Sequence, residues 1–264
     1  MNNENSIKEI VKEKYGSIAV EKDRNSCCGS GCCNTSNYNI MNEEYDGLNG
    51  YNPDADLGLG CGLPTKFAKI KKGDTVIDLG SGAGNDCFIA RAEAGETGKV
   101  IGIDFTPEMI EKAKENVKRK GFTNVEFIFG DIDNMPVSSD IADVVVSNCV
   151  LNLVPNKKAV FNEIYRVLKT NGHFSISDIV KTGDFPEEIL NTVEMYAGCV
   201  AGAVSKDEYL SFIKEAGFKN ITVQKENIII LPDEILENNF SDDTINLYKA
   251  NSDVIRSITV YAEK

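Results

Sequence analysis

Short apolar segments alternate with amphipathic ones through the middle of the chain. The apolar segments are the length of strands and cover residues 75–79, 99–103, 125–129, 142–147 and 173–180. Apolar residues recur at helical spacing between them, over about 85–94, 107–120 and 159–169. Strands that alternate with helices predict a mostly parallel, doubly wound sheet covered on both faces.

The boundaries of two of these helices are marked by local signals. Thr106 can cap the helix at 107–120, Pro107 suits its first position, and Gly121 can end it. The pair Asn171 and Gly172 is expected to end the helix at 159–169 before the next strand begins.

The flanking regions are less regular and predict a three-part organisation. Residues 1–24 predict a helix, with Ile7, Ile10, Val11 and Tyr15 on one face, and the rest of 1–60 predicts a cysteine-rich arm. Residues 61–180 form the core. Residues 181–264 predict a smaller α+β region with helices near 186–198 and 205–216 and strands near 220–230 and 255–262. With these strands the sheet would have seven.

The net charge narrows the choice of partners. The 264 residues carry 41 acidic and 28 basic side chains, which gives a net charge of −13. This balance repels phosphate backbones and anionic lipids, so we expect no nucleic-acid or membrane partner. Neither a secretory signal pattern nor an apolar run long enough for a membrane span is present. We expect a cytoplasmic monomer.

Eight cysteines are unusual for a chain in a reducing compartment, where they more often indicate metal binding or redox chemistry than disulfides. Four lie close together, at positions 27, 28, 32 and 33. Of the dispersed ones, Cys87 lies beside Phe88 and Ile89 on a predicted helix, and core packing explains it. The other dispersed cysteines, at 61, 149 and 199, can act together only if the fold gathers them.

The most informative local motif is the glycine-rich turn after the first predicted strand. Asp78, Gly80, Gly82 and Gly84 follow the order D-x-G-x-G-x-G. A dinucleotide fingerprint would need glycine where Asn85 stands, and the Lys-Ser/Thr pair of a P-loop is missing. A carboxylate at position 78 suits a cationic ligand and would repel pyrophosphate.

Two further acids lie at the ends of the next strands. Asp104 is placed to accept hydrogen bonds from ribose hydroxyls. Asp131 could accept one from an adenine amino group, with Ile132 packing on the ring. A purely structural turn with solvated aspartates is the alternative, but the set resembles the class I S-adenosylmethionine (SAM) methyltransferase fold, which is Rossmann-like. The residues expected to bind the cofactor are Asp78, Gly80, Ser81, Gly82, Gly84, Asp104, Phe105, Thr106, Met109, Gly130, Asp131, Ile132 and Asn148.

Three dispersed cysteines are candidates for holding the acceptor. Cys149 follows the fourth predicted strand, which neighbours the first strand in a doubly wound sheet, so it should face the transferable methyl group. Cys61 and Cys199 are each flanked by glycine, which permits close backbone approach. Thiolates are soft ligands, and they match a soft metalloid such as trivalent arsenic.

The segments around these cysteines resemble the arsenite methyltransferase family; they are residues 59–64, 147–153 and 196–203. The resemblance extends more broadly over residues 25–220. The resemblance implies that Cys61, Cys149 and Cys199 hold As(III), supplied as arsenite or an As(III)–thiol conjugate. It implies that Cys32 or Cys33 takes part in thiol–disulfide cycling, with Cys61 as a candidate partner. The implied cofactors are SAM and a thiol reductant, glutathione or thioredoxin, so thioredoxin is also a candidate protein partner.

Two other functions remain open. A SAM methyltransferase of a small organic acceptor, such as a quinone or sterol precursor, would leave the three spaced cysteines unexplained. A non-catalytic metalloid-binding or thiol redox protein would leave the three strand-end acids unexplained. An oxygen-methylating enzyme acting on a phenol would usually need a base or a metal near its acceptor. The only histidine, His173, opens a predicted strand and is expected to be structural or exposed, although an Asp, Glu or Lys could serve as the base.

Overall fold

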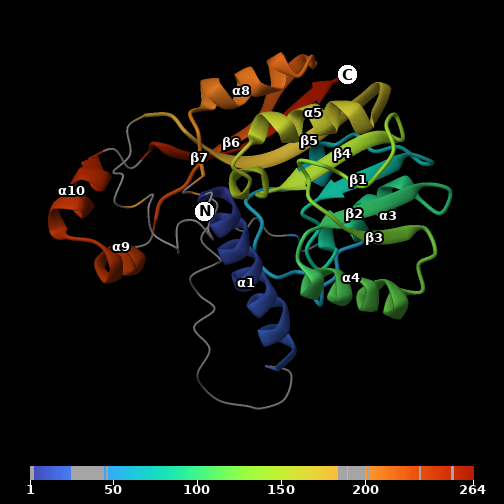
Figure 1. Cartoon of the computed structure of the whole chain (residues 1–264), viewed down its shortest axis with the longest axis horizontal. Helices are drawn as coiled ribbons and strands as arrows, with labels where there is room; N and C mark the ends of the chain where they lie inside the picture. The colour runs from blue at the N-terminus through green and yellow to red at the C-terminus, as the bar shows by residue number, and fades with distance from the viewer. Residues whose placement is uncertain are drawn as a thin grey trace.

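A single seven-stranded sheet forms the centre of the molecule in the computed structural model, which describes residues 3–24, 45, 47–183, 189, 200, 202–231, 233–250 and 253–264 (Figure 1). The strands lie in the order β3-β2-β1-β4-β5-β7-β6, and the predicted seven-stranded sheet is confirmed. The strands are β1 (Thr75–Leu79), β2 (Lys99–Asp104), β3 (Val125–Phe129), β4 (Ala142–Asn148), β5 (Leu168–Lys181), β6 (Lys219–Ile228) and β7 (Ile255–Glu263).

The order of the strands determines which chain segments meet at the carboxyl edge. Strands β1 to β5 are parallel, and β1 lies between β2 and β4, as predicted. Leu79 at the end of β1 is in register with Ser147 near the end of β4. The antiparallel β7 lies between β5 and β6. The segments that follow β1, β2 and β4 therefore emerge side by side, where doubly wound sheets bind ligands.

Helices cover both faces of the sheet (Figure 1). The apolar residues of β1 alternate between two clusters: Ile77 and Leu79 pack with α5 and α8, whereas Val76 packs with α3 and α4. This alternation is the period-two pattern of a strand buried on both sides. The helices are α1 (Asn3–Arg24), α2 (Pro64–Phe67), α3 (Asn85–Ala94), α4 (Pro107–Lys120), η3 (Leu151–Leu153), α5 (Lys157–Val167), α8 (Lys206–Glu215), α9 (Asp233–Asn239) and α10 (Asp242–Ala250).

The structure corrects the expected boundary between α5 and β5. The helix starts earlier than predicted because Asn156 caps it, its side-chain oxygen accepting a hydrogen bond from the Ala159 N–H at 3.1 Å. It ends at Val167, so Asn171 and Gly172 do not end it and instead lie within β5, where Asn171 has a φ of 67°. The helices α9 and α10 were not predicted. The helix expected at 186–198 lies outside the described residues except for Ile189.

The N-terminal helix α1 confirms the prediction for residues 1–24 and packs against α4. Gly16 allows the close approach, because a Cβ there would lie 3.1 Å from a carboxylate oxygen of Glu108. Lys112 Nζ also donates to the Ala19 carbonyl oxygen at 3.0 Å. Val11 is buried, in agreement with the predicted apolar face. The side chains of Ile7 and Ile10 lie outside the described residues.

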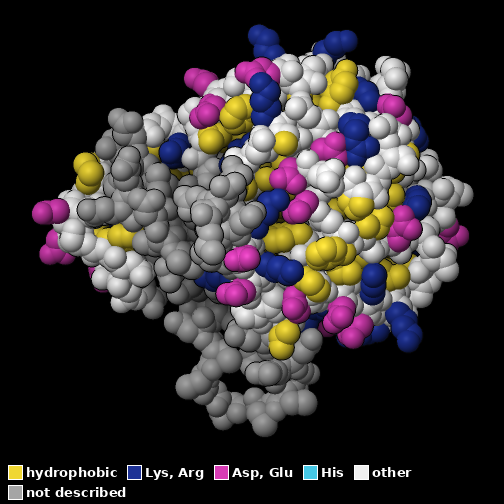
Figure 2. Space-filling model, viewed as in Figure 1, with side chains coloured by type: hydrophobic (Ala, Val, Ile, Leu, Met, Phe, Trp, Pro, Cys, Tyr) yellow, Lys and Arg dark blue, Asp and Glu magenta, His cyan; other side chains and the backbone are white. Residues whose placement is uncertain are grey.

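The described surface carries charges of both signs. Acidic and basic side chains are interspersed over the face drawn in Figure 2. None of the described helices is both long enough and apolar enough to span a membrane.

Candidate active site

The glycine turn after β1 has a backbone that only glycine adopts without strain. Gly80, Gly82 and Gly84 have φ values of 64°, 51° and 98°. A Cβ on Gly80 would lie 2.4 Å from Val150 Cγ2, and one on Gly84 would lie 2.6 Å from Phe127 Cζ. Gly84 also precedes the first residue of α3. The turn therefore brings bare backbone to the carboxyl edge of the sheet.

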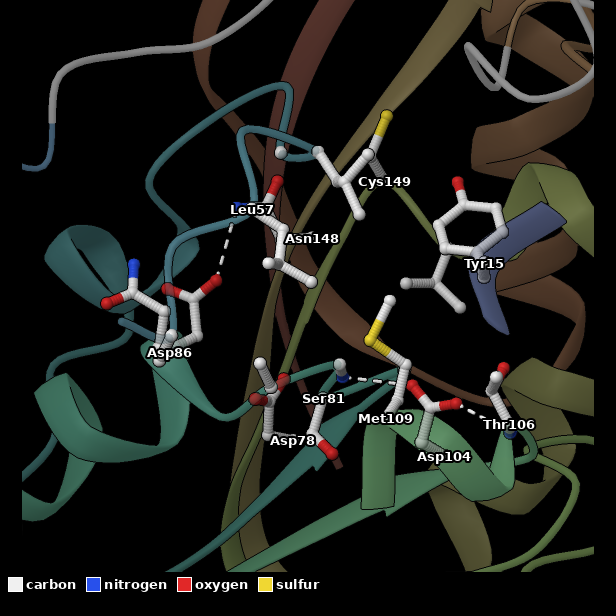
Figure 3. A pocket seen from close by; sticks show the side chains of 18 of the residues that line it. Tyr15, Leu57, Asp78, Ser81, Asp86, Asp104, Thr106, Met109, Asn148 and Cys149 are labelled. Atoms are coloured by element: carbon white, nitrogen blue, oxygen red, sulfur yellow. Dashed lines mark hydrogen bonds between the residues drawn. The ribbon is translucent and has the colours of Figure 1, made fainter. Parts of the chain in front are cut away.

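This turn borders a pocket that joins the predicted cofactor residues to Cys149 (Figure 3). In this view Asp104 and Thr106 lie at one end of the pocket, and the Cys149 sulfur lies at the far end, with Met109 and Asn148 between. The predicted residues that line it are Asp78, Gly80, Ser81, Gly82, Asp104, Phe105, Thr106, Met109, Asn148 and Cys149.

The remaining predicted cofactor residues lie beside this pocket. Asp131 and Ile132 line a smaller adjoining pocket that also contains Asp104 and Phe105. Gly84 and Gly130 are not among the residues that line either pocket. Gly130 is needed for close packing, since a Cβ there would lie 2.6 Å from Pro136 Cδ.

Asp104 is held rigidly at the end of β2. Its two carboxylate oxygens accept hydrogen bonds from the backbone N–H groups of Gly82, at 2.9 Å, and Thr106, at 2.8 Å. Burial raises the pKa of Asp104, and these backbone hydrogen bonds oppose the shift. Asp104 lines the main pocket, where the hydroxyl groups of a ligand can reach its carboxylate.

Asp131 has a partner that the sequence did not indicate. Strand β3 ends two residues earlier than Asp131, at Phe129. Lys8 from α1 contacts Asp131 at 3.1 Å and Asp133 at 3.2 Å. Desolvation lowers the pKa of Lys8. The hydrogen bonds to Asp131 and Asp133, together with the charges of these carboxylates, outweigh the desolvation, so the pKa is raised. The N-terminal helix thus closes the outer side of the smaller pocket.

Asp86 is a pocket residue that sequence reasoning missed. It lies in the first turn of α3 and accepts hydrogen bonds from Tyr45 Oη at 3.0 Å, Asn148 Nδ2 at 3.2 Å and Thr65 Oγ1 at 3.5 Å. Burial raises its pKa to about 6, although these donors lower it. Its position directly after the glycine turn was the available signal. Tyr45 lies in an irregular segment and gave none.

Asp78 is almost completely buried, and Cys87 Sγ lies 3.2 Å from its carboxylate. Burial, followed by the charge of Asp86, raises the pKa of Asp78 well above its usual value. Cys87 is packed in the core, as predicted, and its thiol also donates to this carboxylate.

The charge of the main pocket restricts its ligand. Four aspartates line it, at positions 56, 78, 86 and 104, and no Lys, Arg or His is among its described lining residues. Such a pocket favours a cationic ligand. His173 lies elsewhere, with Nε2 at 2.6 Å from the Ala68 carbonyl oxygen and its ring beside Tyr261.

Two of the three predicted arsenic-binding cysteines are described, and they share one environment. Cys61 and Cys149 are buried in the same apolar cluster. Val200, the residue directly after Cys199, belongs to this cluster as well. Cys149 has a φ of 60°, and its N–H donates to the Ser177 carbonyl oxygen at 2.8 Å. Cys32, Cys33 and Cys199 lie outside the described residues, and the described part of the chain contains no cluster of three metal-ligating side chains.

Comparison with known proteins finds methyltransferases. A family model described as a methyltransferase domain matches residues 70–217. A Halobacterium salinarum protein named arsenite methyltransferase is 43% identical over 229 residues, which cover 82% of this chain and 58% of that protein. A demethylmenaquinone methyltransferase of Lactobacillus johnsonii is 28% identical, covering 70% of this chain and 84% of that protein.

A solved structure extends the similarity to the fold. The crystal structure of CrArsM, an arsenic(III) S-adenosylmethionine methyltransferase from Chlamydomonas reinhardtii, superposes with a TM-score of 0.65 at 27% identity. The alignment covers 89% of this chain and 75% of that one.

Proposed function

Because the chain belongs to the methyltransferase-domain family and has the class I SAM methyltransferase fold, we propose that it transfers methyl groups from SAM to trivalent arsenic. One observation carries the proposal: a single pocket joins the glycine turn and Asp104 to Cys149. The 43% identity to a protein named arsenite methyltransferase supports the choice of acceptor. The chain spans 58% of that relative's length, so the activity is inferred from the site as well as from the likeness.

The residues of the pocket fit SAM, which would supply an electrophilic methyl group on a sulfonium. The bare backbone of Gly80 and Gly82 can approach the ligand closely. Asp104 would accept hydrogen bonds from ribose hydroxyls, and the acidic side of the pocket, with Asp78 and Asp86, would receive the cationic amino-acid end. Asp131 and Ile132 would border the adenine, with Lys8 holding Asp131 in place.

Cys61, Cys149 and Cys199 would hold the arsenic as thiolates. Cys61 and Cys149 lie in one buried cluster, and Val200 ties the segment after Cys199 to the same cluster. Three sulfur ligands would leave the arsenic lone pair free to attack the methyl carbon, and this lone pair carries no proton. No general base is then needed for this step. Positioning of the two substrates would supply most of the rate.

Attack on the methyl carbon would break its bond to the sulfonium sulfur, release S-adenosylhomocysteine and leave the methylated arsenic formally pentavalent. Two cysteine thiolates would return the arsenic to the trivalent state by forming a disulfide, so the thiols must be reduced for each turnover. We propose that Cys32 or Cys33 exchanges with an active-site thiol and that glutathione or thioredoxin restores it. Free thiols persist in a reducing compartment, so we place the proposed enzyme in the cytoplasm. We further propose that it acts as a monomer.

The proposal is tested by incubating the protein with labelled SAM, arsenite and glutathione and determining the arsenic species formed. We expect methylated arsenicals from the wild type and little or none from Cys149→Ser or Cys199→Ser. Both variants should still bind S-adenosylhomocysteine, which shows that the pocket has folded. Wild-type methylation by both variants would overturn the arsenic site.

A small organic acceptor is the second candidate, because the chain resembles a demethylmenaquinone methyltransferase. The identity is 28%, against 43% for the arsenite methyltransferase, and this function leaves the buried cysteine cluster unexplained. Methylation of a naphthoquinone in the same assay, with arsenite left unchanged, would favour it. Membership in a methyltransferase family argues against a non-catalytic metalloid-binding or redox protein.

A further inference from the structure

The side-chain amide of Asn148 has more acceptors than it can serve. Its nitrogen lies 2.5 Å from Tyr45 Oη, 2.8 Å from the Gly62 carbonyl oxygen and 3.2 Å from Asp86 Oδ2. An amide nitrogen carries two hydrogens, so at most two of these three acceptors receive a full hydrogen bond at one time. The carboxylate of Asp86 is the only charged acceptor among them, and charge-assisted hydrogen bonds are the stronger ones.

The same side chain holds the loop that carries Cys61. Asn148 Oδ1 accepts a hydrogen bond from the Cys61 N–H at 3.0 Å, while its nitrogen donates to Gly62. The backbone of this loop packs closely against the amide: a Cβ on Gly60 would lie 2.6 Å from Asn148 Nδ2. Cys149 is the next residue in the chain. One amide therefore contacts a pocket carboxylate on one side and holds the Cys61 loop on the other, directly beside Cys149 in the chain.

A cation in the pocket would change this competition. A positive group beside Asp86 would draw the carboxylate's lone pairs toward itself and weaken their hold on the amide. Tyr45 Oη and the Gly62 carbonyl oxygen are already the two nearest acceptors, and they would then take the two amide hydrogens without a third competitor. The hydrogen bond that holds the Gly62 carbonyl of the Cys61 loop would be stronger, so the loop would be better ordered before arsenic binds.

We propose that Asn148 couples the two sites, so that a cationic amino-acid end bound beside Asp86 strengthens the binding of trivalent arsenic at Cys61 and Cys149. This inference rests on the proposed function, and it names Asn148 as a positioning residue that acts through the Cys61 loop. Linkage requires the effect to be reciprocal: bound arsenic must strengthen cofactor binding by the same factor.

The coupling is measured by calorimetric titration of arsenite into the full chain, with and without saturating S-adenosylhomocysteine. This ligand carries the same amino-acid end and has no methyl group to transfer, so no turnover interferes. We expect it to raise the arsenite affinity of the wild type about fivefold or more. Absence of binding by either ligand would count against the proposed function. Binding of both ligands with no change in affinity would overturn the coupling alone.

Three variants locate the effect. Asn148→Asp keeps the acceptor for the Cys61 N–H but lacks both donors, and Asp86→Asn keeps the shape but removes the charge. In each, we expect arsenite to bind with nearly the same affinity whether or not the second ligand is present. Asn124→Ala is the matched control, because its amide bonds the carbonyl oxygens of Gly95 and Gly98 far from the pocket. Wild-type coupling in either Asn148→Asp or Asp86→Asn would contradict the proposal.

Discussion

The aspartates around the pocket share a charge but differ in what holds each carboxylate. The Asp104 carboxylate accepts hydrogen bonds from two backbone N–H groups, which fixes the orientation of the carboxylate. The Asp86 carboxylate accepts hydrogen bonds from three side chains, and the Asp78 carboxylate accepts one from a thiol. Burial raises the pKa of all three. On the proposed function these environments would give the carboxylates different roles: Asp104 would orient a neutral polyhydroxyl group, while Asp78 and Asp86 would face a cation.

Replacing Asp104 should weaken cofactor binding strongly. Hydrogen bonds to a charged group are worth about 1.5–3 kcal/mol, so Asp104→Ala should lower the affinity for S-adenosylhomocysteine by about 10- to 100-fold. Calorimetric titration measures this affinity. Asp74→Ala, at the opposite end of the sheet, is the control and should bind as the wild type does. An unchanged affinity in Asp104→Ala would remove this residue from the site.

Asp86 should make stability depend on pH. Because its pKa is about 6 in the folded protein against an ordinary 3.8, the folded state binds the proton more tightly than the unfolded chain does. The contribution that protonated Asp86 makes to the free energy of unfolding is fully present below pH 3.8 and is lost as pH rises through about 6. At pH 8 the ionised group costs about 3 kcal/mol, a figure good only to order of magnitude.

Asp86→Asn removes this cost and should be more stable than the wild type at pH 8. The difference should shrink by about half at pH 5, as urea unfolding of the ligand-free proteins would measure. Exposed Asp54→Asn should change stability little at either pH. A difference between Asp86→Asn and the wild type that is the same at both pH values would contradict a raised pKa at Asp86.

Among the elements, α1 lies outside the region matched by the family model yet forms a wall of the pocket. Val11 and Tyr15 line the main pocket, and Lys8 lines the smaller one. The helix is anchored on α4 through the close approach at Gly16. Contact with the cofactor would therefore come from a segment about 70 residues before the glycine turn.

Displacing α1 should weaken cofactor binding without unfolding the core. Val11→Asp would bury a charge in the apolar cluster, which is unfavourable enough to detach the helix. We expect at least a tenfold loss in affinity for S-adenosylhomocysteine, while the core still unfolds cooperatively in urea. Ser17→Asp places the same residue on an exposed part of this helix and should have little effect. Equal affinities of the two variants would exclude α1 from the site.

The turn after Val200 is packed as tightly as the glycine turn. A Cβ on Gly202 would lie close to the Asn152 carbonyl oxygen, which is backbone and cannot rotate away. Gly202→Ala should therefore shift the segment next to Cys199, cost about 1–3 kcal/mol of stability and weaken arsenite binding. Unfolding and arsenite titrations measure the two effects. In Gly183→Ala the new methyl would meet Val254 at an ordinary 3.4 Å, so this control should be close to wild type.

At the scale of the whole molecule, the strand order brings distant segments to one pocket. Much of this arrangement could be predicted, because alternating periodicity indicated the parallel strands, and the D-x-G-x-G-x-G turn with Asp104 indicated the edge of the sheet where the pocket lies. What the sequence could not give depends on tertiary contacts. Lys8 and Tyr45 reach the pocket from helical and irregular segments whose local pattern carries no ligand signal.

The early end of α5 was missed for a related reason. Val167 and Leu168 continue an apolar helical pattern, but Leu168 is in register with Ala142 of β4, and this pairing overrides the local preference. The gathering of the thiols is likewise a tertiary property. Position after the fourth strand and glycine neighbours made Cys149, Cys61 and Cys199 candidates, and the resemblance implied that they act together. The shared cluster of Cys61, Cys149 and Val200 now supports that grouping.

In the proposed enzyme, thiols from three distant segments share one arsenic atom at the cofactor pocket. X-ray absorption at the arsenic edge, on protein loaded with one equivalent of arsenite and saturating S-adenosylhomocysteine, counts the sulfur neighbours directly. We predict three sulfur ligands in the wild type and two in each of Cys61→Ser, Cys149→Ser and Cys199→Ser. A three-sulfur shell that persists in all three variants would place the arsenic elsewhere and contradict the claim.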